Sequence, residues 1–162
     1  MGRWAVTIAT GAALACGAAG ASAFMPQHTQ TAAAQTLVTI ETRGGQRQFR
    51  VEIARTRAQQ DRGLMFRTEI PANGGMLFTP YPAEGPPREA SFWMKNTPSP
   101  LDILFIRRDG TVAAIAASVA PFSETPVKSG EVVASVLEIN GGKAAELGIA
   151  VGDKVRWTPA RK

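Results

Sequence analysis

Short segments of alternating apolar and polar residues constrain the fold of this chain more than any other feature. Val38 and Ile40 alternate with polar residues, and after Gly44-Gly45 the alternation resumes in residues 49–53. Because strand side chains point alternately to the two faces of a sheet, each segment predicts a half-buried strand. The glycine pair between them predicts an antiparallel hairpin.

The remaining pattern also favours strands over helices. Residues 101–106 are apolar on both faces except at Asp102, which predicts a central strand. The pattern Thr56-x-x-Gln59 predicts a short helix that Gly63 ends, and Asn140 predicts a second short helix that Gly148 ends. Further strands are expected at residues 76–78, 92–95, 112–119, 132–139 and 154–157. We therefore expect a mainly β fold, a compact small barrel or sandwich with two short helices.

Two long loops are expected, at residues 79–89 and 121–131. The first holds four prolines and a glycine, a composition that excludes a helix or a central strand. It immediately precedes residues 92–102, so we expect it to form a wall or a lid over a site there.

The polar side chains within residues 92–102 predict that site. Lys95, Asn96 and Asp102 are expected around one turn between two strands, and Glu138 is the single carboxylate at one end of an apolar row. Buried carboxylates are paired, hydrogen-bonded or shifted in pKa. Lys95, Asp102 and Glu138 are the candidate catalytic residues. The candidate ligand-binding residues are Arg62, Arg67, Trp93, Lys95, Asn96, Asp102 and Glu138.

Three functions fit these residues. We favour a non-enzymatic binding or accessory module in which Trp93 and Tyr81 form a pocket for an envelope glycan, a peptide or a small molecule, with no cofactor. A hydrolase or transferase acting on an envelope substrate through the catalytic candidates, with Asn96 as an oxyanion donor, is the alternative. A lower alternative is Cu(I) binding by thioethers, although methionines in apolar runs ordinarily fill the core and we assign no metal site. Those methionines are Met65, Met76 and Met94.

The first residues predict export. Arg3, the apolar residues 5–15 and Ala21-Ser22-Ala23 form a signal-peptide pattern with cleavage after Ala23, and a lipoprotein at Cys16 is the less favoured alternative. We expect a signal peptide at residues 1–23, a flexible leader at 24–36 and one globular domain at 37–162. The chain's single cysteine and single histidine lie outside that domain, which argues against cysteine or histidine catalysis and their zinc sites.

The formal net charge of +5 comes from scattered basic residues rather than a dense basic run. We expect no nucleic-acid partner and, after signal cleavage, no transmembrane span. We expect a periplasmic or secreted monomer.

Ordered motifs along the chain resemble the domain-of-unknown-function family 192. They are Gly63-Leu64-Met65-Phe66-Arg67, Gly75-Met76-Leu77-Phe78, Phe92-Trp93-Met94-Lys95-Asn96-Thr97, Pro100-Leu101-Asp102, Val136-Leu137-Glu138 and Gly152-Asp153. The resemblance runs over residues 49–157. It implies a compact, strand-rich single domain that is often exported and has no established biochemical activity.

Overall fold

The computed structural model describes residues 34–158. The expected signal peptide and residues 24–33 of the expected leader lie outside the described residues. The first strand begins at Gln35, two residues before the expected start of the domain. None of the helices within residues 34–158 is long and apolar enough to cross a membrane.

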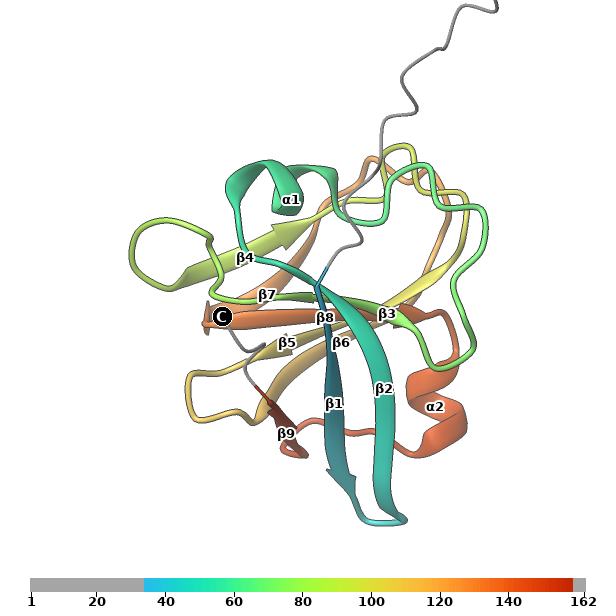
Figure 1. Cartoon of the computed structure of the whole chain (residues 1–162), viewed down its shortest axis with the longest axis vertical. Coiled ribbons are helices and arrows are strands. Elements are labelled where there is room, and N and C mark those ends of the chain that lie inside the picture. Colours follow the sequence, from blue (N-terminus) through green and yellow to red (C-terminus); the bar gives the residue numbers. More distant parts are fainter. Residues whose placement is uncertain (1–33, 159–162) are drawn as a thin grey trace, which may run out of the picture. The chain divides into compact units, whose positions relative to one another are not determined.

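The fold is mainly β, as predicted, with a curled seven-stranded sheet that forms a half-barrel, a second small sheet and two short helices (Figure 1). The strand order of the large sheet is β6-β5-β8-β3-β2-β1-β9, and the small sheet pairs β4 with β7. The strands are β1 Gln35–Thr42, β2 Gly45–Ala54, β3 Gly75–Phe78, β4 Arg88–Phe92, β5 Leu101–Ile106, β6 Val112–Val119, β7 Val127–Val133, β8 Ser135–Asn140 and β9 Lys154–Trp157. The helices are α1 Arg57–Arg62 and α2 Lys143–Leu147.

The predicted N-terminal hairpin is confirmed. β1 and β2 pair antiparallel from Gln35↔Glu52 to Thr42↔Gly45, and Gly45 takes the positive φ of 105° that the turn requires. β2 then pairs in parallel with β3, so the chain must cross between them, and α1 lies in that connection.

The predicted start of α1 is also confirmed. The hydroxyl of Thr56 accepts a hydrogen bond from the Gln59 amide, and the Gln59 side chain accepts one from the Thr56 amide, which completes a capping box. Gly63 ends the helix with a φ of 49°, although its ψ of −135° lies outside the left-handed helical region.

Strand β5 is central and buried throughout, as its two apolar faces predict. Leu104 and Ile106 pack into a first core cluster with the β1–β2 hairpin and α2, whereas Ile103 and Phe105 pack into a second core cluster. The second core cluster also contains residues of β3, β4 and β7. The large sheet therefore has a different apolar layer on each face.

The expected strand through Lys95 is wrong, because β4 ends at Phe92. After this point Met94 donates to the carbonyl of Ser123 at 2.7 Å, and the Thr97 amide turns back to the carbonyl of Met94 at 3.0 Å. Asn96 has a positive φ of 54°, a conformation that a strand cannot contain. Trp93 therefore lies beyond the end of the strand, and Lys95 lies in a turn with Asn96.

The expected single strand at residues 132–139 is two strands, and β7 begins inside the expected loop at 121–131. The break falls at Ala134, whose amide donates to the carbonyl of Ile106 while its carbonyl accepts from the amide of Tyr81. The chain leaves the small sheet and joins the large sheet at this residue.

The expected cap of α2 by Asn140 is also wrong. Asn140 is the last residue of β8, and its side-chain Nδ2 donates to the carbonyl of Pro71 at 2.9 Å. Gly142 is the residue at the cap position, and it has no side chain of its own that could accept from the helix amides. Gly148 ends the helix in the left-handed conformation that the sequence predicts.

Candidate functional site

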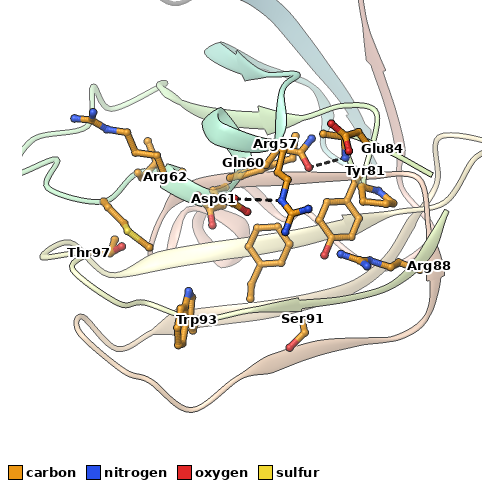
Figure 2. Close-up of a pocket in the computed structure, with 18 residues that line it drawn as sticks. Arg57, Gln60, Asp61, Arg62, Tyr81, Glu84, Arg88, Ser91, Trp93 and Thr97 are labelled. Carbon is orange, nitrogen blue, oxygen red and sulfur yellow. Dashed lines mark hydrogen bonds and ion pairs between the residues drawn. The ribbon is translucent and has the colours of Figure 1, made fainter. Parts of the chain in front are cut away.

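A cavity of about 500 Å³ lies between α1, the proline-rich loop after β3, and β4 (Figure 2). This volume is within the range of small-molecule sites. The loop forms one wall, as its position in the sequence predicts. The residues that line the cavity are Arg57, Gln60, Asp61, Arg62, Gly63, Leu64, Met65, Phe78, Tyr81, Pro82, Ala83, Glu84, Arg88, Ser91, Phe92, Trp93, Thr97 and Glu138.

Gln60 fixes the loop against the helix. Its Nε2 donates to the carbonyls of Ala54 and Pro80 at 3.1 and 2.6 Å, and its Oε1 accepts from the amide of Ala83 at 2.9 Å. A single side chain therefore joins the end of β2, α1 and the loop. Because an amide in this geometry uses both its donors and its acceptor, it holds the wall of the cavity in one position.

Aromatic rings form the apolar part of the cavity. Phe92 packs edge-on against Phe78 with a centroid distance of 5.1 Å, and it lies 5.5 Å from Tyr81. Phe105 supports Phe92 from the second core cluster, with ring centroids 6.1 Å apart. These contacts bury the side of Tyr81 while leaving it on the cavity surface.

Glu138 adds a buried carboxyl group to the lining of the cavity. It lies on β8 beside Met76 of β3 and Ile103 of β5, so its side chain shares the face of the second core cluster. The residue is 4% exposed, and its Oε2 has no hydrogen-bond partner within the described residues. Burial away from water raises the pKa of Glu138 from 4.5 to about 8, so the carboxyl is mostly protonated at neutral pH.

Charged side chains surround the opening. Arg57, Arg62 and Arg88 contribute positive charge, whereas Asp61 and Glu84 contribute negative charge. Arg57 lies 3.7 Å from Asp61 in an exposed i,i+4 pair, an arrangement that stabilises a protein very little. With Glu138 protonated, the lining keeps one net positive charge.

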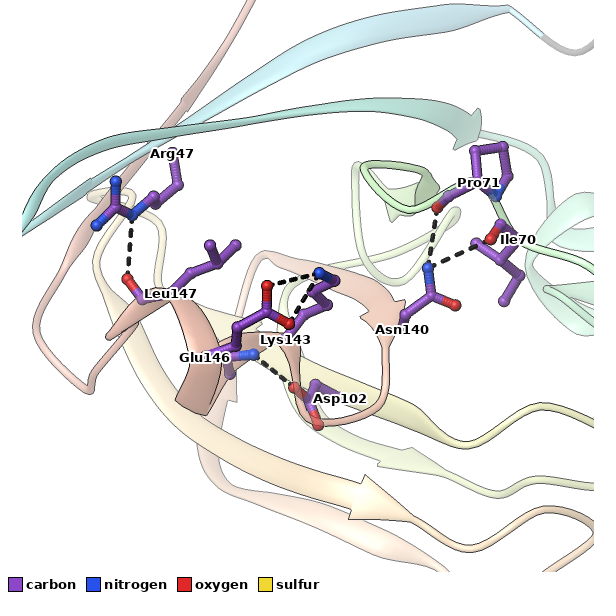
Figure 3. A network of polar contacts seen from close by, with 9 residues as sticks. Arg47, Ile70, Pro71, Asp102, Asn140, Lys143, Glu146 and Leu147 are labelled. Atoms are coloured by element: carbon purple, nitrogen blue, oxygen red, sulfur yellow. Dashed lines mark hydrogen bonds and ion pairs between the residues drawn. The ribbon is translucent and has the colours of Figure 1, made fainter.

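Asp102 lies on the opposite face of the large sheet from Glu138. It pairs with Ile139 of the first core cluster, whereas Ile103 pairs with Glu138. Its fully buried carboxylate accepts hydrogen bonds from the amides of Ser118, Gly142 and Ala144 at 2.7, 2.9 and 2.6 Å. Asp102 therefore caps α2 from a neighbouring strand, in the position where the sequence led us to expect Asn140 (Figure 3).

The structure does not bring Lys95, Asp102 and Glu138 together as a catalytic group. Lys95 is exposed, and its Nζ lies 5.1 Å from the centre of the Trp93 ring, an arrangement typical of a cation–π contact. Trp93 is 46% exposed and lines the edge of the cavity. Asn96 accepts a hydrogen bond from the Phe66 amide through its backbone carbonyl.

The two candidate arginines are also separated. Arg62 lines the cavity, whereas Arg67 forms an ion pair with Glu52 at 2.8 Å. Three of the seven residues that we predicted as ligand-binding therefore line the cavity, namely Arg62, Trp93 and Glu138.

The methionines considered for Cu(I) have different surroundings. Met76 and Met94 are buried in the second core cluster, and Met65 lines the cavity. Within residues 34–158, no three or more histidine, cysteine or acidic side chains are placed to hold a metal ion.

Sequence reasoning did not identify Arg57, Gln60 or Arg88 as site residues. Arg57 and Gln60 lie on a six-residue helix with no buried residue, so no apolar periodicity showed which face packs inward. The useful signal was the proline-rich loop itself, because residues of α1 and β4 lie on either side of it in the sequence.

A protein-family model matches nearly all of the described residues. The family model described as DUF192, Uncharacterized ACR, matches residues 38–157. The chain is similar to a crystal structure of a protein of unknown function from Novosphingobium aromaticivorans DSM 12444, with 47% identity and a TM-score of 0.74 over 80% of this chain and 90% of that one. It is also similar to a candidate transcription regulator from Sinorhizobium meliloti 1021, with 39% identity and a TM-score of 0.72 over 77% of this chain and 95% of that one. No curated protein matches the chain.

Proposed function

This chain belongs to the DUF192 family, and we propose that it is an exported protein that binds a small organic ligand in the cavity between α1, the proline-rich loop and β4. The observation that carries this proposal is Glu138, a buried carboxyl with an unpartnered oxygen at the cavity. A buried polar atom without a partner lowers the stability of a fold. Groups retained at such a cost are characteristic of functional sites.

The surroundings of Glu138 support binding more than catalysis. Aromatic rings and a few convergent polar groups are the usual composition of a ligand pocket. The candidate catalytic carboxylates face opposite sides of a sheet, so Asp102 is not available to act with Glu138 on one substrate. A binding protein needs only the cavity and its polar groups.

The proposed compartment is the periplasm or the extracellular medium. It is supported by the signal-peptide pattern in residues 1–23. The ligand would then be a molecule of the cell envelope or its surroundings. Expression of the full chain in a Gram-negative host tests this point: we expect the periplasmic extract to contain a protein whose N-terminal residue is Phe24, and an uncleaved cytoplasmic protein would contradict the proposal.

A fragment screen followed by protein NMR tests the binding function. Amide chemical shifts of the purified protein are recorded with each fragment, for the parent and for Ser91→Trp, which places a large ring in the cavity opening. The matched control is Thr125→Trp, on an exposed residue that does not line the cavity.

The proposal predicts fragments that shift the amides of cavity residues in the parent and in Thr125→Trp, with the shifts lost in Ser91→Trp. Fragments that shift only residues outside the cavity, or that shift all three proteins alike, would overturn it.

A further inference from the structure

We propose that the ligand is a zwitterion, an amino acid or a related small molecule that carries both an ammonium group and a carboxylate. This inference rests on the proposed binding function and names the ligand class of the same cavity. It places the ammonium group against Glu138 and the carboxylate between Arg57 and Arg88.

Residue 138 carries a carboxyl group where an amide of similar size would fit. A glutamine there would fill nearly the same volume and would offer a donor and an acceptor without an ionisable group. What a carboxyl adds is a negative charge when a cation enters the cavity. A bound ammonium would satisfy the free Oε2 and would favour the ionised form of Glu138.

The rings of Phe78, Tyr81 and Phe92 support the same placement. Their faces carry the negative part of the aromatic quadrupole, which attracts a cation, most strongly where water is excluded. All three rings line the cavity together with Glu138. The described elements beside Glu138 in the sheet present Met76 and Ile103, so no cation from β3 or β5 occupies this position.

Two arginines at the opening of the cavity are suited to bind the carboxylate. Figure 2 shows Arg57 from α1 and Arg88 from β4 extending towards the ring of Tyr81. Arg88 forms no ion pair within residues 34–158, and the pairing of Arg57 with Asp61 is long and exposed. Two guanidinium groups and a phenol hydroxyl supply the donors that a carboxylate prefers.

The charges of the cavity lining favour a zwitterion over a ligand that carries only a cation or only an anion. The titratable groups facing the cavity besides Glu138 and Tyr81 are three arginines, Asp61 and Glu84. A ligand with only a cation would meet the repulsion of the arginines, and one with only a carboxylate would leave Glu138 without a partner. A phosphate carries about two negative charges, more than the single net positive charge of this lining balances.

Titration calorimetry on the purified protein tests the inference. The zwitterionic probes are glycine, L-phenylalanine, 4-aminobutyrate and 6-aminohexanoate, which vary the ring content and the spacing of the two charges. Hexylamine and hexanoate are the single-charge controls. We expect the best zwitterion to bind at least about tenfold more tightly than either control, the affinity ratio that corresponds to one added charge-assisted hydrogen bond.

Two signatures connect the binding to Glu138. Binding of an ammonium to a protonated Glu138 must release a proton, so the measured heat should depend on the ionisation enthalpy of the buffer at pH 7, and affinity should rise from pH 6 to pH 8. Glu138→Gln should weaken the zwitterion at least about tenfold while leaving hexanoate unchanged. Arg88→Gln should weaken both, and Arg108→Gln, an exposed arginine outside the cavity, should weaken neither.

The possible outcomes distinguish a failure of the zwitterion inference from a failure of the proposed binding function. Hexanoate or hexylamine binding as tightly as every zwitterion, or no probe binding a cavity that takes other fragments, overturns the inference and leaves the binding function intact. A cavity that takes neither the probes nor any fragment overturns both.

Discussion

Replacement of Glu138 by glutamine should stabilise this protein at neutral pH. In the native state burial raises the pKa of Glu138 to about 8, whereas in the unfolded chain the residue keeps its ordinary value of 4.5. Between these two values the native state binds a proton that the unfolded state has lost. Stability therefore falls as pH rises from 4.5 to 8, and it is unaffected by this group below 4.5.

The size of this loss of stability follows from the pKa values of Glu138 in the native and unfolded states. Each unit of pKa difference corresponds to about 1.4 kcal/mol, so Glu138 reduces the free energy of unfolding by about 3 kcal/mol at pH 7 and by about 5 kcal/mol above pH 8. Such a loss is a large share of the total stability of an ordinary domain, about 5–15 kcal/mol. Glutamine does not ionise, so the variant should escape this loss.

Urea unfolding of the parent and of Glu138→Gln at pH 4, 5.5, 7 and 8.5 measures this difference. We expect the two proteins to be nearly equal at pH 4 and to diverge progressively up to pH 8.5, with the variant more stable. Glu84→Gln, on an exposed residue of the cavity opening, should follow the parent at every pH. A constant difference between Glu138→Gln and the parent, or a variant less stable at pH 7, would refute the reasoning.

Three further substitutions test other parts of the structure. Asp102→Asn should lower the free energy of unfolding by about 3–5 kcal/mol, because the new side-chain nitrogen would face at least one of the three backbone amides that donate to the carboxylate. Asp153→Asn, which removes the charge from a carboxylate with one such bond, should lower it by less than about 1 kcal/mol. Equal effects in urea titrations would contradict this account. Gly75→Ala should lower the yield of folded protein, because its Cβ would clash with the backbone carbonyl oxygen of Glu138. In Gly44→Ala the one tight contact of the Cβ is with the movable end of the Arg47 side chain. Equal thermal stability of the two variants would exclude the clash. Gln60→Ala should speed hydrogen exchange at the Ala83 amide about tenfold or more, and unchanged exchange relative to Gln48→Ala would show that Gln60 does not hold the loop.

Local sequence signals predicted those parts of the fold that depend on local physics. The β1–β2 hairpin depends on the turn at Gly44-Gly45, and the start of α1 depends on the contact between Thr56 and Gln59. The break at Ala134 depends on hydrogen bonds to Ile106 and Tyr81, which are distant in the sequence. No pattern within residues 132–139 could show that the chain changes sheets there.

In the candidate site, too, the features that depend on residues distant in the sequence were not predicted. The sequence predicted the loop that forms a wall of the cavity and four of the lining residues, because a proline-rich loop and an isolated carboxylate are visible locally. Those residues are Arg62, Tyr81, Trp93 and Glu138. The sequence did not predict which face of α1 meets that loop. Gln60 sets which face of α1 meets the loop, because its side chain bonds to Pro80 and Ala83. These partners lie within reach of Gln60 only when β2 and β3 are paired.

Asp102 and Glu138 show why two similar sequence signals lead to different conclusions. Each is the single carboxylate in a buried apolar strand, so the same desolvation opposes both. Three backbone amides compensate Asp102, and its charge is used to fix α2. No group within residues 34–158 compensates the Oε2 of Glu138, so the fold retains it at a loss of stability. A glutamine would avoid most of that loss, and this is why we propose that the benefit of the carboxyl comes from a ligand that enters the cavity.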